Sequence, residues 1–286
     1  MSTIRNVGVI GAGTMGNGIA QACAVAGIDA VMIDVAEAPL AKGLAAIGAS
    51  LERLVKKEKL SAADRGAALA RVRTSADYAA LGGVDLVIEA ATENPSVKFE
   101  ILRRADGVAK PDAILATNTS SISITQLAAV TKRPDRFLGM HFFNPVPMMA
   151  LVELIRGLQT SDATVAAADA FAKVLGKTPI TVKNSPGFVV NRILCPMLNE
   201  AIFLYGEGVA SAKEIDEGMK LGCNHPLGPL ALTDMIGLDV LLAVMEVFAA
   251  DFGDSKYRPA PLLKEMVAAG WLGRKSGRGF YTYETK

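Results

Sequence analysis

The chain has 286 residues, 51% of them hydrophobic, which is enough for more than one compact core. Its 30 lysines and arginines nearly balance its 29 aspartates and glutamates, so no overall charge favours nucleic acid or an anionic membrane surface. Glycine, aspartate or proline interrupts each apolar stretch before it reaches the roughly 20 residues of a membrane span. We therefore expect no nucleic acid and no membrane as partners, and a cytoplasmic protein.

The first residues and the cysteines fit this expectation. A strand-like run begins at residue 7 and leaves no room before it for a targeting peptide, so none is expected. Cys23, Cys195 and Cys223 are odd in number and far apart, without the spacing of a metal site. We expect reduced thiols that act as packing residues, with no disulfide and no bound metal.

Short β-branched runs alternate with longer helical patterns in the first half of the chain. The predicted strands are residues 7–10, 30–33, 86–89, 114–117, 138–141 and 152–155. This alternation predicts βαβ units and a mostly parallel sheet with helices on both faces. Between the second and third strands, leucines and an isoleucine recur every three or four residues from Leu40 to Leu54. They predict an amphipathic helix or hairpin, at about residues 38–60, that projects from the sheet.

The pattern changes after a turn cluster at residues 184–187. Beyond it, strand alternation is lacking until residues 279–283, and two apolar helix faces appear at residues 197–205 and 238–248. We therefore predict an α/β fold with a Rossmann-type doubly wound sheet over residues 1–185, followed by a smaller, all-helical domain over residues 186–286. The apolar content of the second domain favours a homodimer formed through it, although an internal core explains the same pattern.

A glycine pattern directly follows the first predicted strand and precedes a helix predicted over residues 17–26. It consists of Gly11, Ala12, Gly13, Thr14, Met15 and Gly16. The first glycine permits a tight turn, the second lets the backbone approach a pyrophosphate, and the third allows close helix packing. The helix N-terminus offers unpaired N–H groups to phosphates. Asp34, after the second strand, can accept hydrogen bonds from ribose hydroxyls and repel a 2′-phosphate, which favours NAD over NADP.

Two histidines are available for acid–base chemistry. His141 ends a predicted strand at the edge where open α/β sheets bind ligands, whereas His225 lies in a turn rich in proline and glycine and is interpreted as structural. A histidine at a strand end is in itself more often a packing residue. Glu153 interrupts the apolar run of the next strand, where an unpaired carboxylate is costly to bury. A neighbouring imidazole explains it, and an edge-strand carboxylate in water explains it equally well.

Eight segments, taken in order, resemble the 3-hydroxyacyl-CoA dehydrogenase family over essentially the whole chain, and in particular its short, single-function 3-hydroxybutyryl-CoA members. The segments are residues 11–16, 88–93, 117–121, 139–145, 152–155, 184–192, 225–229 and 275–281. The resemblance implies an NAD-dependent enzyme that interconverts (S)-3-hydroxyacyl-CoA and 3-ketoacyl-CoA with short acyl chains.

The same resemblance implies roles for individual residues. His141 is the acid/base, and Glu153 orients it. Ser120 and Asn191 hydrogen-bond the substrate or cofactor near the reacting carbon. The further cofactor-binding positions are Glu93, Lys98, Asn118, Asn144 and Lys275. The positions that contact the CoA moiety are Ser50 and Lys57.

Each of these assignments has an ordinary alternative. Serines and asparagines in turns usually satisfy the local backbone, although Asn191, on the first helix of the second domain, is placed to close a cleft between the domains. Lys56, Lys57 and Lys59 are normally a solvated helix face, and Lys57 is preferred on the resemblance alone.

Two other functions fit the fold. A dehydrogenase of the β-hydroxyacid type also joins a Rossmann domain to a helical one, but it uses a catalytic lysine and would not need His141. A catalytically silent NAD-binding protein would retain the fold without turnover. The presence of both His141 and Glu153 argues against silence.

Overall fold

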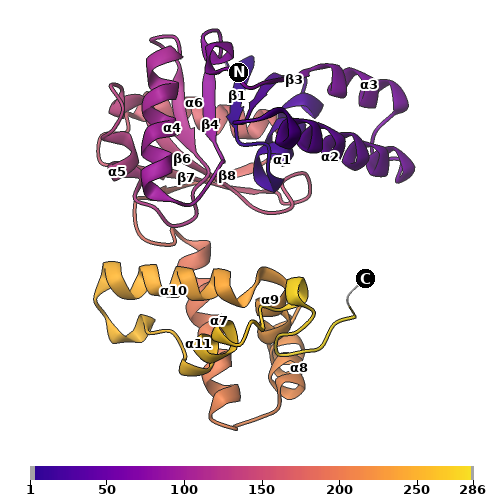
Figure 1. The fold of residues 1–286 in the computed structure, drawn as a ribbon, viewed down its shortest axis with the longest axis vertical. Helices are drawn as coiled ribbons and strands as arrows, with labels where there is room; N and C mark the ends of the chain where they lie inside the picture. Colours follow the sequence, from indigo (N-terminus) through magenta and orange to yellow (C-terminus); the bar gives the residue numbers. More distant parts are fainter. Residues whose placement is uncertain (1–3, 285–286) are drawn as a thin grey trace. The chain divides into compact units, whose positions relative to one another are not determined.

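The computed structural model describes residues 4–284 and contains two compact units (Figure 1). One unit ends at Ser185 and contains an eight-stranded sheet, and the other begins at Pro186 and is built from helices. The predicted fold class, a Rossmann-type sheet followed by a helical part, is confirmed. Within residues 4–284, no helix has the length and apolar character needed to span a membrane.

The sheet has the strand order β3-β2-β1-β4-β5-β6-β7-β8. Its strands are β1 (Asn6–Ile10), β2 (Asp29–Ile33), β3 (Val72–Ser75), β4 (Leu86–Glu89), β5 (Ile114–Thr117), β6 (Phe137–Phe142), β7 (Leu151–Arg156) and β8 (Thr178–Lys183). Neighbouring strands are parallel except for β6 and β7, which are antiparallel. The carboxyl ends of β1, β2, β4, β5 and β6 therefore share one edge of the sheet, where open α/β sheets bind ligands.

All six predicted strands are confirmed, but β3 and β8 are not predicted from the sequence. They are the two edge strands of the sheet. β3 consists of one valine followed by arginine, threonine and serine. β8 contains Pro179 and no buried residue. An edge strand that is partly open to water needs few hydrophobic residues, so its pattern is weak.

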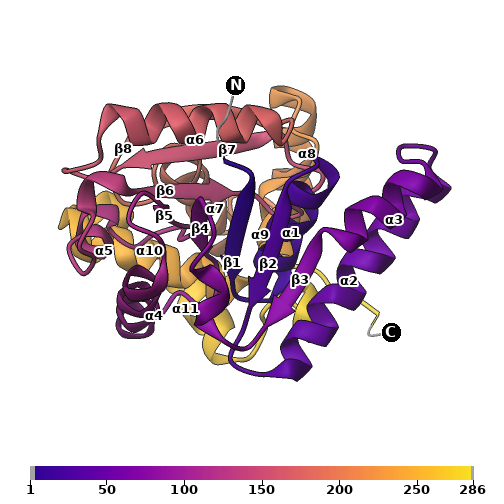
Figure 2. The ribbon, with the colours of Figure 1, turned by 90° about the horizontal axis from the view of Figure 1, so that it is seen from above.

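Helices cover both faces of the sheet (Figure 2). They are α1 (Thr14–Val25), α2 (Glu37–Lys56), α3 (Ala62–Ala70), α4 (Pro95–Val108), α5 (Ile124–Ala128) and α6 (Asp162–Val174), with short 3-10 helices η1 (Tyr78–Leu81) and η2 (Pro134–Arg136). On β6, Leu138 lies in the same core cluster as Phe171 of α6, whereas the adjacent Gly139 faces Ile124 of α5. Because side chains alternate along a strand, His141 lies on the α5 side of the sheet.

The projecting segment predicted at about residues 38–60 is the helix α2, and α3, beyond the predicted bounds, completes a helical hairpin that Figure 2 shows beside β3. Leu40, Ile47 and Leu51 are buried against the core cluster, as their spacing predicts. The other faces of the hairpin are exposed over most of their length. It therefore extends the surface of the unit while keeping one apolar stripe buried.

Helix α1 begins three residues earlier than predicted, at Thr14 rather than residue 17. Gly11, with φ of +104°, turns the chain so sharply that Gly13 already occupies the N-cap position. The N–H of Asn17 donates to the Gly13 carbonyl at 2.9 Å and closes the first helical turn. The glycine pattern is thus partly helix, and not only the turn before one.

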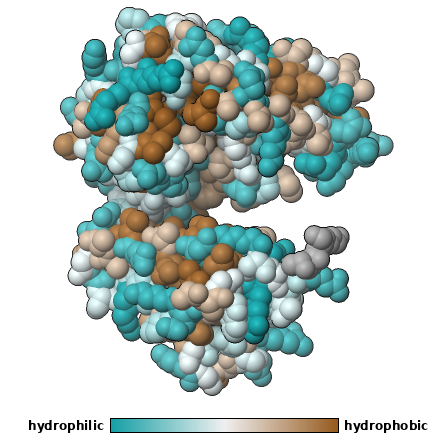
Figure 3. Space-filling view, viewed as in Figure 1, coloured by the Kyte–Doolittle hydropathy of each residue, from teal (hydrophilic) through white to brown (hydrophobic). Residues whose placement is uncertain are grey.

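The second unit packs its helices around one hydrophobic cluster. They are α7 (Val190–Gly206), α8 (Ala212–Cys223), α9 (Pro229–Ile236), α10 (Leu238–Phe252) and α11 (Pro261–Ala268), with 3-10 helices η3 (Ser255–Tyr257) and η4 (Arg274–Ser276). Leu198 and Ile202 of α7 and Leu241 and Met245 of α10 are buried, as the two predicted apolar faces require. Hydrophobic side chains also reach the surface of this unit (Figure 3), among them Ile193, which is 68% exposed.

The strand pattern noted at residues 279–283 does not form a strand. The segment makes only isolated bridges, and the N–H groups of Phe280 and Tyr281 each donate to the Asp234 carboxylate at 3.0 Å. Tyr283 Oη donates to the same carboxylate at 2.9 Å, and burial raises the pKa of Tyr283 to about 12. The buried Asp234 carboxylate thus binds the backbone N–H groups that a neighbouring strand would otherwise bind.

The cysteine expectation is wrong for one residue. Cys23 and Cys195 are buried, and burial raises the pKa of each thiol to about 12. Cys223 is exposed at the end of α8 and is not a packing residue. Its hydrophobic neighbour Leu221 is 84% exposed as well, so the last turn of α8 lies outside the core.

Candidate active site

The glycine pattern forms a tight turn with an open side. A Cβ atom on Gly11 would lie 2.6 Å from the Ala90 carbonyl oxygen, and one on Gly16 would lie 1.8 Å from the Gly11 carbonyl oxygen. Gly13 has no atom within 4 Å of its ideal Cβ position and caps α1 without a side chain. The turn is therefore closed on the protein side and open at Gly13, which fits a pyrophosphate at the helix N-terminus.

Asp34 is joined to this turn directly. Its Oδ2 accepts a hydrogen bond from the N–H of Ala12 at 2.8 Å, and its Oδ1 accepts one from Val35 N–H at 2.7 Å. The side chain is half-buried at the end of β2. The structure thus brings together the sequence-predicted residues of the turn, with Thr14 exposed and Met15 half-buried, and the predicted ribose-binding carboxylate.

His141 and Glu153 form a buried pair across the antiparallel strands β6 and β7. The two residues are directly opposite in the register, and His141 Nδ1 lies 2.7 Å from Glu153 Oε2. Their side chains are 8% and 0% exposed. The alternative of an edge-strand carboxylate in water is wrong, because β8 lies beyond β7. The ring of Phe143 packs against the imidazole at a centroid distance of 4.5 Å.

A second carboxylate holds the turn that follows β5. Glu93 Oε1 accepts hydrogen bonds from the Ser120 N–H at 2.8 Å and the Ser120 hydroxyl at 3.1 Å. Glu93 Oε2 accepts one from the Thr119 hydroxyl at 2.7 Å. Asn118 Oδ1 accepts a hydrogen bond from Phe142 N–H at 2.8 Å and so joins the ends of β5 and β6. Ser120 is thereby fixed at the edge of the sheet that carries the glycine turn and His141.

The remaining predicted residues of the first unit are Lys98, Ser50, Lys57 and Asn144, and Lys98 Nζ lies 3.9 Å from Glu93 Oε2. Ser50 is half-buried in α2, and Lys57 is exposed at its C-cap. Asn144 is exposed and precedes a cis proline, Pro145. The second unit contributes the other two. Asn191 is half-buried in the first turn of α7, and Lys275 Nζ pairs with Asp239 Oδ1 at 2.5 Å.

Sequence reasoning missed two contributors to this edge. Glu89 is a fully buried carboxylate at the end of β4, and Phe143 supports the imidazole. Two features of the sequence point to Glu89. It ends an apolar strand, and a second glutamate, Glu93, follows four residues later. Among the described residues, no group of three or more histidine, cysteine or acidic side chains is placed to hold a metal ion.

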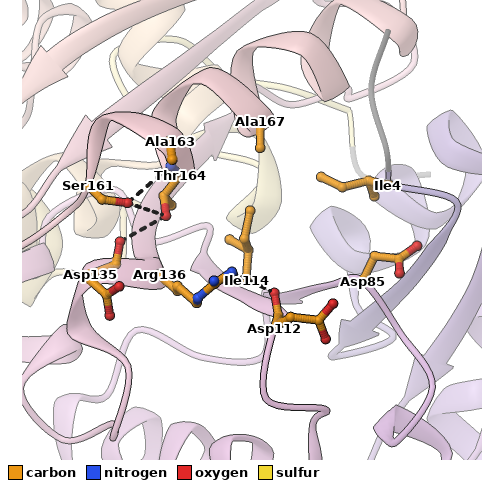
Figure 4. Close-up of a pocket in the computed structure, with 10 residues that line it drawn as sticks. All are labelled: Ile4, Asp85, Asp112, Ile114, Asp135, Arg136, Ser161, Ala163, Thr164 and Ala167. Atoms are coloured by element: carbon orange, nitrogen blue, oxygen red, sulfur yellow. Dashed lines mark hydrogen bonds between the residues drawn. The ribbon is translucent and has the colours of Figure 1, made fainter.

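A cavity of about 620 Å³ lies at the opposite, amino-terminal edge of the sheet (Figure 4). Ile4, Asp85 and Ile114 line it where β1, β4 and β5 begin. Figure 4 shows Ser161 and Thr164 on another wall, hydrogen-bonded to each other and to Asp135. None of the predicted site residues lines this cavity, so it is separate from the candidate active site.

The shared edge of the glycine turn and the imidazole–carboxylate pair is the arrangement of a dinucleotide-dependent oxidoreductase. Residues 6–185 match the family model described as "3-hydroxyacyl-CoA dehydrogenase, NAD binding domain", and residues 187–283 match the model of the C-terminal domain of the same enzymes. The chain belongs to the 3-hydroxyacyl-CoA dehydrogenase family.

Relatives of known name are similar over nearly their whole length. A 3-hydroxybutyryl-CoA dehydrogenase of Bradyrhizobium diazoefficiens is 52% identical over 99% of this chain and 96% of its own. The human mitochondrial hydroxyacyl-coenzyme A dehydrogenase is 44% identical over 98% and 92%. The crystal structure of (S)-3-hydroxybutyryl-CoA dehydrogenase from Ralstonia eutropha is 67% identical with a TM-score of 0.97, covering 99% of this chain and 100% of that one.

Proposed function

We propose that the protein interconverts (S)-3-hydroxyacyl-CoA and 3-ketoacyl-CoA with NAD, and that its acyl chains are short, as in 3-hydroxybutyryl-CoA and acetoacetyl-CoA. The observation that carries the proposal is the buried contact between His141 Nδ1 and Glu153 Oε2 at the cofactor edge of the sheet. The names of the relatives supply the substrate class. The family match argues against the β-hydroxyacid alternative.

His141 would exchange a proton with the substrate oxygen. Because Glu153 contacts Nδ1, Nε2 would be the nitrogen that exchanges the proton with the substrate. The Glu153 carboxylate would stabilise the imidazolium that forms when the alcohol is deprotonated. Burial strengthens the interaction of the carboxylate with the charged ring. Bound NAD would supply the hydride acceptor in this reaction. The Ser120 hydroxyl, which donates to Glu93 in this structure, would turn to donate a neutral hydrogen bond to the reacting oxygen, while the Ser120 N–H keeps the contact with Glu93.

The cofactor site combines the glycine turn with Asp34. The open position at Gly13 fits the pyrophosphate, and the Asp34 carboxylate disfavours a 2′-phosphate, which supports NAD over NADP. Glu93 and Asn118 would complete the site by holding the turn that contains Ser120. The roles of Lys98, Asn144 and Lys275 as cofactor contacts, and of Asn191 as a substrate contact, rest on the family pattern.

The CoA moiety would bind along α2. Ser50 and Lys57 are seven residues apart, so they lie on one face of the helix. The exposed Lys57 ammonium can pair with a CoA phosphate, whereas the buried stripe of α2 holds the helix to the sheet.

We further propose a cytoplasmic homodimer formed through the helical unit. Two observations support the dimer. Val209 and Leu221 of this unit are 65% and 84% exposed. A cavity of about 460 Å³ between α7 and α8 is lined mainly by apolar side chains, among them Leu204 and Met219. Exposed apolar side chains and an apolar cavity on one unit are typical of a subunit interface.

The first experiment follows NADH oxidation with acetoacetyl-CoA, with NADPH in a parallel reaction and His141→Ala as the matched control. We expect turnover with NADH that is largely lost in the variant and is weak with NADPH. A folded protein that binds NADH but converts no short-chain acyl-CoA would contradict the proposal and support the silent NAD-binding alternative.

A further inference from the structure

A pocket of about 280 Å³ in the first unit takes no part in the proposed acid–base step or in the cofactor site. It lies between α1, the end of α2, the turn after β6 and the end of α6, and most of its walls are apolar. Val25 of α1 and Val174 of α6 line it and are 45% and 44% exposed. Apolar side chains that stay open to water on the rim of a pocket favour an occupant with apolar groups.

One polar group in this pocket has no partner. Gln21 of α1 is 2% exposed, and its Nε2 makes no hydrogen bond to any residue in the described range 4–284. A buried amide N–H without a partner costs free energy, so such groups are usually bound to water or to a ligand. Because Gln21 lines the pocket, an occupant with a carbonyl oxygen can accept this hydrogen bond. Gln21 therefore adds a specific polar contact to largely apolar walls.

The walls of the pocket are held in place by the protein itself. Lys177 Nζ donates to the carbonyl oxygen of Val146 at 2.5 Å and to that of Met149 at 2.8 Å, which ties the turn after β6 to the end of α6. The same turn packs closely on α1, because a Cβ atom on Gly18 would lie 2.9 Å from Val146 Cβ. Pro147, within this turn, is thereby a fixed wall of the pocket. A pocket with fixed walls needs no rearrangement to receive a ligand.

The pocket lies beside the helix face proposed to bind CoA. Leu54 lines it and comes four residues after Ser50 and three before Lys57, so the three share one face of α2. On the other side, Pro147 follows His141 by six residues, a separation of at most about 20 Å along an extended backbone. α1 and α6 pack on one core cluster, whereas His141 lies on the α5 side, so a ligand that joins them passes the carboxyl end of β6.

We propose that this pocket binds the pantetheine arm of the acyl-CoA and that Gln21 donates a hydrogen bond to one of the amide carbonyl groups of the arm. The inference rests on the proposed function, which supplies the substrate class. Within CoA the arm joins the phosphates to the thioester, and the protein offers Lys57, the pocket and His141 in that order. The arm combines methyl and methylene groups with amides, as the apolar walls and Gln21 require. An ordered water would satisfy Gln21 alone but would leave the apolar rim open to solvent.

Gln21→Met tests the role of the amide in the full-length protein. Methionine keeps the length of the side chain and removes a buried nitrogen without a partner, so the melting temperature should stay the same or rise. We expect the Kd for coenzyme A, measured by calorimetry, and the KM for acetoacetyl-CoA to rise about fivefold, the effect of one neutral hydrogen bond. The Kd for adenosine 3′,5′-bisphosphate, which lacks the arm, and the KM for NADH should not change. Gln126→Met, at an exposed glutamine of α5, is the matched control and should change none of these constants.

A Gln21→Met variant that binds coenzyme A like the wild type would overturn the inference, whatever its stability, since Gln21 would then bind water only. Equal losses for coenzyme A and for adenosine 3′,5′-bisphosphate would also overturn it, because the effect would not depend on the arm. If Gln21→Met does not fold, Ala22→Leu, whose larger side chain enters the pocket, takes its place with the same expectations for the two ligands. Coenzyme A binding needs no turnover, so a wild type that binds coenzyme A but does not reduce acetoacetyl-CoA would refute the proposed reaction while leaving this comparison decisive.

Discussion

At the scale of single residues, the sequence predicts the groups that differ in type from their surroundings. Glu153 stands out because it interrupts an apolar strand, and the structure pairs it with His141 as predicted. Glu89 also ends an apolar strand, but its partner Lys98 lies in a helix that begins after an intervening turn. A cross-strand pair can be inferred from two neighbouring strands, whereas a strand-to-helix pair depends on a packing geometry that no spacing in the sequence records.

We expect Glu153→Gln to lower kcat about a thousandfold. The amide keeps a hydrogen bond to the imidazole but loses the charge that stabilises the imidazolium, so the proton transfer should slow far more than the binding of either substrate weakens. Steady-state kinetics with NADH and acetoacetyl-CoA measure this, with thermal unfolding as a check on folding. A variant that keeps more than about a tenth of the wild-type kcat would show that Glu153 does not support the acid/base.

The carboxylate of Asp85 predicts a pH dependence of stability. Burial tends to raise its pKa, but hydrogen bonds from Lys110 Nζ and from the N–H groups of Arg5 and Asn6 outweigh burial and hold the pKa below its ordinary value of 3.8. The folded protein therefore binds this proton less readily than the unfolded chain does. The stabilisation is complete above the ordinary value and is lost as the pH falls through the lower, folded value.

The variant Asp85→Asn tests whether the stability changes with pH in this direction. We expect the wild type to exceed the variant in free energy of unfolding by a constant amount above about pH 5, and the difference to shrink below the ordinary pKa as Asp85 becomes protonated. Urea unfolding of both proteins at a series of pH values provides the measurement. A difference that stays the same down to the lowest pH at which the wild type folds would mean that Asp85 has no depressed pKa.

At the scale of elements, predictability follows burial. The central strands and the buried stripe of α2 are evident in the sequence because their hydrophobic residues must pack on both faces or along one side. β3 and β8 are missed because an edge strand has fewer core neighbours. The start of α1 is misplaced because Gly13 caps it without a side chain, so the usual capping signal is missing.

Alanine substitutions at two glycines of α2 are expected to change the stability in opposite directions. A Cβ atom on Gly43 would lie 2.7 Å from the Ala12 carbonyl oxygen and 3.0 Å from Met32 Cε, whereas one on Gly48 would meet no atom within 4 Å. Gly43→Ala should therefore push α2 away from the glycine turn, destabilise the protein by about 1–3 kcal/mol and weaken NADH binding. Gly48→Ala, the matched control, should stabilise it by up to about 1 kcal/mol through helix propensity.

Urea unfolding and NADH titration measure both glycine variants. Equal stability of the two would show that α2 does not need its close approach to the turn. A destabilised Gly43→Ala variant with unchanged NADH affinity would show instead that the turn keeps its shape when the helix shifts.

The position of Lys57 at the end of α2 predicts a selective kinetic effect. Lys57→Ala should raise the KM for acetoacetyl-CoA about tenfold, the effect of one lost charge-assisted contact, while the KM for NADH changes little. Lys59→Ala, an exposed lysine two residues away, is the control and should leave both constants near the wild type. Equal increases in the two KM values for Lys57→Ala would contradict a specific contact with CoA.

At the scale of the whole molecule, the change from alternating strands to helical spacing near residue 184 indicates two parts, and the structure contains one compact unit on each side of Ser185. The sequence does not show which hydrophobic residues of the helical part are buried in its core and which are exposed. Leu198 and Leu241 are buried in its core, whereas Ile193 of α7 and Leu221 of α8 are exposed. Helical spacing is the same for both sets, because a face that packs inside and a face that packs on a partner need the same periodicity.

A dimer through the helical unit predicts a mass twice that of the 29.9 kDa chain in sedimentation equilibrium. Leu204 is half-buried and lines the apolar cavity between α7 and α8, so an introduced carboxylate there would lose most of its remaining water in the dimer. Leu204→Glu should therefore dissociate the dimer, while Leu158→Glu, at a residue of the other unit that is 86% exposed, should leave it intact. Because the cavity is apolar, salt should not restore the association. A wild type that sediments as a monomer at micromolar concentration would refute the dimer, and a Leu204→Glu variant that stays dimeric would place the interface on a different surface.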